Sequence, residues 1–89
     1  MIRSKNFIKR KIGTQYVIVA VGEATKRFNG MISVNSTGSF IWDALENELS
    51  MEALLDKVTE AYEVDADTAR GDVQDFIDTL KEAGAIEKY

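Results

Sequence analysis

The stretch that most constrains the fold is Gly30–Leu45, which reads GMISVNSTGSFIWDAL. It begins with MISV, a short and mostly apolar run that is typical of a strand. Asn, Ser and Thr follow at 35–37, and the side-chain oxygens of these residue types cap helices. Apolar residues then recur at helical spacing. We therefore predict a strand over 31–34 that passes directly into a helix, so that the strand fixes the position of the helix.

Two further strands are predicted before this joint. Residues 7–12, FIKRKI, mix apolar and basic side chains and indicate a strand with one solvated face. Gly13 and Thr14 form a turn, and residues 16–21, YVIVAV, are an unbroken apolar run typical of a central strand. Residues 22–29 are predicted to be a polar connection. The three strands would form a small antiparallel sheet.

The second half of the chain predicts three helices, over 37–48, 51–62 and 66–83. Ser50 and Asp65 precede the second and third helices and are expected to cap them. Both helices carry one apolar stripe that would face the core. The predicted fold is α+β: one small winged-helix-like domain spanning 1–89, with a three-stranded antiparallel sheet followed by three helices.

The ends of these helices are predicted from residues that tolerate a left-handed backbone. Asn47 is expected near the end of the first helix, and Gly84 just after the third. Residues 87–89 are expected to form a tail.

Composition excludes several classes of protein. The 89 residues include no Cys and no His, so no disulfide framework and no Cys- or His-based metal site is possible. No apolar run is long enough to span a membrane, and the N-terminus lacks the apolar segment of a signal peptide. We expect a cytoplasmic protein without a metal or other cofactor and without a membrane partner.

Charge is distributed unevenly along the chain. Residues 1–29 carry a net charge of +6 and residues 30–89 a net charge of −10. Two solvated faces of opposite sign would explain this, and so would a face that steers a charged partner at low salt.

No group of side chains indicates an active site. The acids of the third predicted helix lie on its polar side, where a solvated face explains them better than acid–base chemistry. The hydroxyls near the first helix have no His to activate them and are better explained as caps. Trp42 is expected in the core. The acids in question are Asp72, Asp75 and Asp78, and the hydroxyl residues are Ser36, Thr37 and Ser39. We predict that the chain is not an enzyme.

Two helices joined by a short turn beside a sheet also describe a winged-helix DNA-binding protein. A recognition helix that contacts phosphates should be neutral or basic. Residues 66–83 instead carry a net charge of −3. We therefore expect no nucleic-acid partner. The alternatives to this preferred interpretation are a winged-helix DNA-binding regulator and a general protein–protein adaptor.

The run Val34–Trp42, VNSTGSFIW, resembles the LN-x-T-G-x-x-I-W signature of PqqD-like proteins. Later segments resemble that family in order and spacing: the YEVD at 62–65, the DVQDFI at 72–77 and the GAI at 84–86. Two departures are Val34 in place of the usual Leu, and the lack of the common Gly in 46–50.

This resemblance implies a peptide-binding module, a recognition element for ribosomally made and post-translationally modified peptides. Such proteins bind the leader segment of a precursor peptide as an added strand and present it to a modifying enzyme, often a radical SAM protein. Transferred to this chain, the leader would pair with the edge formed by Met31, Ile32, Ser33 and Val34.

The third helix would form the other wall of the cleft. One flank of its core stripe carries Asp72, Phe76, Thr79 and Ala83, and the other carries Arg70, Gln74, Ile77 and Lys81. We expect the peptide on the first flank, at Asp72, Phe76 and Thr79. Because an unpaired edge strand is also a template for a second copy, we predict a monomer that forms an edge-strand dimer when concentrated. Either Met31 and Ser33 or Ile32 and Val34 would direct their backbone groups outward.

Overall fold

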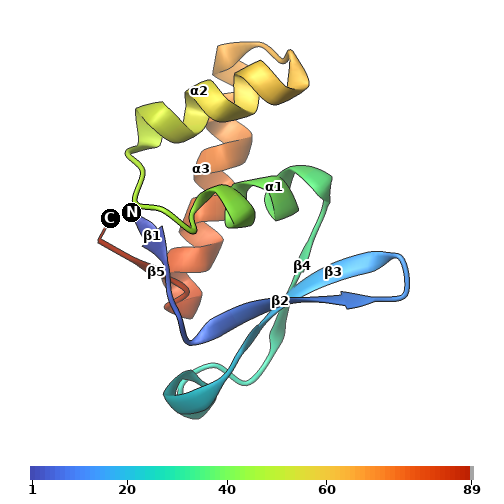
Figure 1. Cartoon of the computed structure of the whole chain (residues 1–89), viewed down its shortest axis with the longest axis vertical. Helices are drawn as coiled ribbons and strands as arrows, with labels where there is room; N and C mark the ends of the chain where they lie inside the picture. Colours follow the sequence, from blue (N-terminus) through green and yellow to red (C-terminus); the bar gives the residue numbers. More distant parts are fainter. Residues whose placement is uncertain (89) are drawn as a thin grey trace.

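The computed structural model describes residues 1–88 and places three helices on one face of a small antiparallel sheet (Figure 1). The order of elements after the N-terminal segment is sheet first and helices second, which confirms the predicted α+β architecture. The elements are β1 (Ile2–Arg3), β2 (Phe7–Ile12), β3 (Gln15–Ala20), η1 (Gly22–Lys26), β4 (Met31–Val34), α1 (Ser36–Ala44), α2 (Met51–Tyr62), α3 (Ala66–Ala83) and β5 (Ile86–Glu87).

The main sheet has the strand order β2-β3-β4, with antiparallel pairing throughout. The apolar strand β3 is central, as its sequence predicts, and its Ile18 is fully buried against the helices. Strand β4 lies at one edge of this sheet. It leads after a single residue into α1, so the predicted joint between strand and helix is confirmed.

Side-chain caps define the start of each helix. Asn35 caps α1 by accepting a hydrogen bond from the Gly38 N–H at 2.8 Å, and Ser50 caps α2 by accepting from the Ala53 N–H at 3.1 Å. Asp65 caps α3. Gly84 follows α3 with a φ of +79°, as predicted for a residue just after a helix.

The core lies between the sheet and the helices. It is formed by apolar side chains from every helix and from both ends of the chain, and Trp42 lies within it, 2% exposed. Its largest fully buried members are Trp42, Ile18, Ile41, Leu45, Leu54, Ile77 and Leu80. The predicted core position of Trp42 is confirmed.

Several local predictions are wrong. The first helix ends at Ala44 and not at residue 48, and Asn47 is not left-handed. The next segment bonds instead to the N-terminus, because the Arg3 N–H donates to Leu45 O and the Leu49 N–H donates to Met1 O. Part of the expected polar connection forms the 3₁₀ helix η1.

The two ends of the chain lie side by side (Figure 1), because β1 pairs with β5 as a second, two-stranded sheet. Glu87, expected in a tail, therefore lies in a strand. The rest of that expected tail includes Tyr89, which lies outside the described residues. No helix among residues 1–88 is long and apolar enough to cross a membrane.

Candidate functional site

Strand β4 presents an edge that no other described strand covers. Within residues 1–88 it pairs with β3 and with no second strand. The backbone N–H and C=O groups on its other side are therefore available to an added strand.

The turn between β2 and β3 determines which residues of β3 bond to β4. Gly13 and Thr14 form a two-residue loop in which Gly13 alone has a positive φ, +64°, the pattern of a type II′ turn. In such a hairpin the closing pair, Ile12 and Gln15, is hydrogen-bonded. Hydrogen-bonded and non-bonded pairs then alternate along the ladder. Counting along β3, Val17 bonds to β2, whereas Tyr16 and Ile18 direct their backbone groups to β4.

The same alternation assigns the two sides of β4. Tyr16 lies opposite Val34 and Ile18 lies opposite Ile32. Ile32 and Val34 therefore bond inward to β3, while the backbone groups of Met31 and Ser33 point away from the sheet. Of the two alternatives that the sequence leaves open, the register favours Met31 and Ser33 as the outward pair.

Side chains alternate between the two faces of β4 in the same way. Ile32 and Val34 are half-buried and share the face of Ile18, which packs against the helices. Met31 and Ser33 are exposed on the opposite face, with Met31 60% exposed. A strand added beside β4 would therefore also direct alternate side chains toward the helices.

A groove of about 310 Å³ lies between the end of β4 and α3. Val34 from β4 and Phe76 from α3 are among its lining residues, together with Gly38 and Ile41 of α1. A Cβ atom on Gly38 would lie only 3.3 Å from both Phe76 Cε1 and Val34 Cβ. The absence of a side chain at Gly38 therefore allows β4, α1 and α3 to meet at this point. The full lining is Ser33, Val34, Asn35, Thr37, Gly38, Ile41, Asp72, Asp75 and Phe76.

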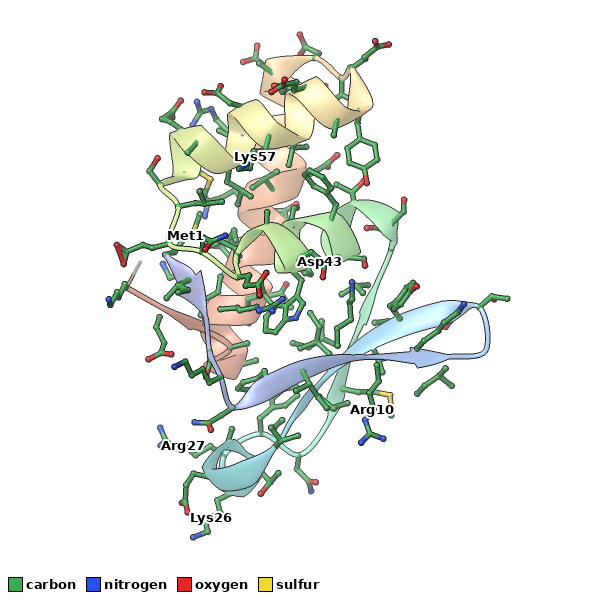
Figure 2. The ribbon with its side chains drawn as sticks, in the orientation of Figure 1. Met1, Arg10, Lys26, Arg27, Asp43 and Lys57 are labelled. Carbon is green, nitrogen blue, oxygen red and sulfur yellow. The ribbon has the colours of Figure 1, made fainter. Side chains whose placement is uncertain are left out.

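Polar contacts hold α1 against the sheet beneath this groove. The Lys9 ammonium on β2 donates to Ser39 Oγ at 2.7 Å and to the Asp43 carboxylate at 2.8 Å. Asp43 points from α1 toward the sheet (Figure 2). The Lys9 side chain is 18% exposed and the Asp43 side chain 61%, so solvent screens this pair in part.

The rim of the groove is negatively charged. Asp72 and Asp75 are both exposed there, and no ion pair involving either is found among residues 1–88. The basic residues Arg10, Lys26 and Arg27 lie at the opposite end of the molecule, on and beyond the sheet (Figure 2). The uneven charge of the sequence therefore becomes a spatial separation, with the acidic end at the groove.

The structure brings together four of the seven predicted site residues. Ser33, Val34, Asp72 and Phe76 line one groove. Met31 and Ile32 lie on the same edge strand without lining it, and the Thr79 hydroxyl bonds back to the Asp75 carbonyl at 3.0 Å. That these residues bind a peptide stays a prediction.

The other flank of α3 faces elsewhere. Gln74, Ile77 and Lys81 line a separate cavity beside the N-terminus, and Arg70 pairs with Glu52 of α2 at 3.1 Å. The sequence reasoning missed Asn35, Thr37, Gly38, Ile41 and Asp75 as lining residues. Four of these five lie in the VNSTGSFIW run, which was the signal that could have identified them.

A larger hollow of about 560 Å³ lies between the N-terminal segment and the end of α1. Three of its charged side chains are held by contacts within the fold: the Arg3 guanidinium donates to Trp42 O at 3.1 Å, and Lys9 binds Asp43.

A comparison with protein-family models matches residues 15–86 to the family described as Coenzyme PQQ synthesis protein D (PqqD). The chain belongs to the PqqD family. The solved structure "TbiB1 in Complex with the TbiA(beta) Leader Peptide" is similar to it, with a TM-score of 0.76 and 25% sequence identity. The similarity covers 100% of this chain and 98% of that one. A comparison with curated protein sequences found no match.

The residues that resemble the PqqD signature each have a structural part in this groove. Asn35 caps α1, Gly38 permits the close approach of Val34 and Phe76, and Ile41 lines the groove, while Trp42 is buried in the core. The run therefore builds the joint at which edge strand, first helix and third helix converge. In this PqqD protein its contribution is to position the groove.

Proposed function

We propose that this chain binds the leader segment of a ribosomally made precursor peptide as a strand added to β4, and presents that peptide to a separate modifying enzyme. Membership of the PqqD family and the similarity to TbiB1, whose structure contains a leader peptide, support the class of ligand. The observation that carries the proposal is the uncovered edge of β4 beside a groove that reaches α3.

The backbone supplies part of the binding energy. Met31 and Ser33 offer two N–H donors and two C=O acceptors to the peptide. At about 0.5–1.5 kcal/mol net for each hydrogen bond, these groups contribute on the order of 2–6 kcal/mol. Micromolar affinity corresponds to about 8 kcal/mol, and ordering a flexible peptide is an added cost. Side chains in the groove must therefore contribute, and they supply the selectivity.

The groove can supply these side-chain contacts. A peptide residue opposite Val34 would direct its side chain to the helix side of the sheet, toward Phe76 and Ile41. Phe76 is half-buried, so a peptide side chain can cover its remaining surface. We expect an apolar leader residue at this position.

The alternative of DNA binding has no observation in its favour. The acidic residues of α3 face solvent beside the groove, where they would repel phosphates. A binding role also fits the groove better than catalysis, because Asp72 and Asp75 are both exposed and solvated.

The test is a titration of purified protein with synthetic leaders of short precursor peptides encoded beside its gene, read by calorimetry and by backbone amide NMR. We expect saturable binding with the largest shifts at residues 31–34 and at Phe76. A scrambled peptide of equal composition is the control. Binding that leaves these amides unmoved, or shifts confined to the β2–β3 hairpin, would contradict the proposal.

A further inference from the structure

A second cavity lies next to the groove, between the end of α2 and the start of α3. We call it the end pocket; it encloses about 170 Å³. Its lining is mostly apolar and consists of Thr37, Val58, Tyr62, Val64, Ala69, Asp72 and Val73. A cavity of about 150 Å³ is large enough to hold benzene, so the end pocket has room for one branched aliphatic or aromatic side chain.

The turn between α2 and α3 builds the mouth of this pocket. Glu63 ends α2 in the left-handed conformation, with a φ of +49°, and Val64 follows it with 40% of its surface exposed. Tyr62 is 38% exposed and is fixed in place, because its ring meets Phe40 edge-on at 5.5 Å and its hydroxyl donates to Ser36 O at 3.4 Å. Two large apolar side chains thus stay exposed at the mouth.

The end pocket and the groove are neighbours that share part of their walls. Thr37 and Asp72 line both of them. Strand β4 ends at Val34, next to the start of α1, and the end pocket lies beyond that point. A peptide paired with β4 that continues past Val34 therefore passes Thr37 and Asp72 and arrives at the end pocket.

The charge at this junction is negative. Asp72 lies where the two cavities meet, with Asp75 on the groove side. Asp65 and Asp67 stand at the nearby start of α3. Arg70, a base on the same part of α3, is engaged by Glu52. A basic side chain on the passing peptide would find carboxylates there.

We propose that the leader extends past β4 and inserts an apolar side chain into the end pocket, with a basic residue beside Asp72 at the junction. This inference rests on the proposed function and adds a second recognition position to it. The leader sequence would thus combine an apolar residue opposite Val34, then a Lys or Arg, then a second apolar residue.

The test uses a library of random 16-residue peptides displayed on phage and selected on the purified protein. Parallel selections use Val64→Ser, which removes apolar surface at the pocket mouth, and Asp72→Asn, which removes the junction charge. Ile12→Ser is the matched control, because Ile12 is 55% exposed at the far end of the β2–β3 hairpin. Ser33→Pro reports whether a peptide uses the edge of β4.

We expect the selected peptides to carry the basic and second apolar residues at a fixed spacing. Val64→Ser should weaken their binding about tenfold, because two buried methyl-sized groups are lost from the contact. Asp72→Asn should abolish enrichment of the basic residue, and Ile12→Ser should change neither. Circular dichroism melts confirm that each variant is folded.

The outcomes separate the two proposals. Peptides that require the edge, as shown by loss of binding to Ser33→Pro, yet bind Val64→Ser like the parent, would overturn the end-pocket assignment and leave the proposed function standing. Selected peptides that bind folded Ser33→Pro like the parent, or a selection that yields no specific peptide, would overturn both.

Discussion

Proline substitutions along β4 should separate the binding of a leader from the stability of the fold. The register assigns the backbone N–H of Ser33 to the outward side and that of Ile32 to the bond with Ile18. Proline lacks this N–H, and sheets tolerate it where the N–H faces outward. Ser33→Pro therefore removes a donor that only the peptide uses, whereas Ile32→Pro removes a bond of the sheet itself.

The two variants should differ by a measurable margin. Ile32→Pro leaves the carbonyl of Ile18 without its partner, which costs about 1–3 kcal/mol. At roughly 4–8 °C of melting temperature per kcal/mol for a domain of this size, it should melt at least several degrees below the parent. Ser33→Pro should stay within a few degrees of the parent. It should lose about ten- to a hundredfold in leader affinity, since one hydrogen bond is lost and the ring obstructs the added strand.

The assay combines thermal melts with titration of the same leader peptide, and Met31→Pro and Val34→Pro repeat the comparison at the neighbouring positions. If Ile32→Pro melts with the parent while Ser33→Pro unfolds, the assignment of inward and outward groups is wrong. If every folded variant binds the leader like the parent, the peptide does not pair with β4.

Three further predictions concern the core, the groove and self-association. Trp42→Ala should lower the free energy of unfolding by about 3–5 kcal/mol, measured by urea denaturation, because Trp42 is 2% exposed; a loss below about 1 kcal/mol would contradict its place in the core. Gly38→Ala should keep the fold but weaken leader binding in the same titration, since its Cβ would press on Phe76 and Val34 at the groove; unchanged affinity would show that the peptide does not reach this point. Sedimentation should detect a weak dimer at high concentration that a saturating leader dissolves, because both use the edge of β4; a dimer that persists with the leader bound would place the self-contact elsewhere.

The sequence was sufficient where local chemistry decides the structure. The cap at Ser50 and the apolar run of β3 were predicted from residue type and spacing, and the structure confirms them. Each depends on contacts within a few residues or on burial that the apolar pattern indicates. For the first helix the sequence offered residues 35–37 as caps, and the structure selects Asn35, while the Ser39 hydroxyl accepts from Lys9 and is not a cap. The edge position of β4 was implied by the resemblance to PqqD-like proteins, and the strand order confirms it.

The sequence-based predictions fail where backbone groups form hydrogen bonds with segments that are distant in the sequence. Helix α1 ends at Ala44, and the backbone groups of the residues that follow bond to the N-terminus of the chain. Leu45 O accepts from the Arg3 N–H, and the Leu49 N–H donates to Met1 O. Nothing in the sequence near Asn47 indicates those partners. Two-residue strands such as β1 and β5 could not be predicted from the sequence either, because each is a strand only through its pairing with the other.

The outward groups of β4 illustrate how a local pattern becomes specific only through the fold. Residues 31–34 alone allow either alternate pair to face the peptide. Gly13, which lines neither the groove nor the end pocket, settles the choice by closing a two-residue turn that fixes which residues of β3 bond to β4. A slip of one residue between β3 and β4 would reverse it, but the slip would also turn Ile32 and Val34 from the helix side to solvent. The apolar burial that holds the sheet in register therefore also keeps the backbone groups of Met31 and Ser33 directed away from β3, where an added strand would pair.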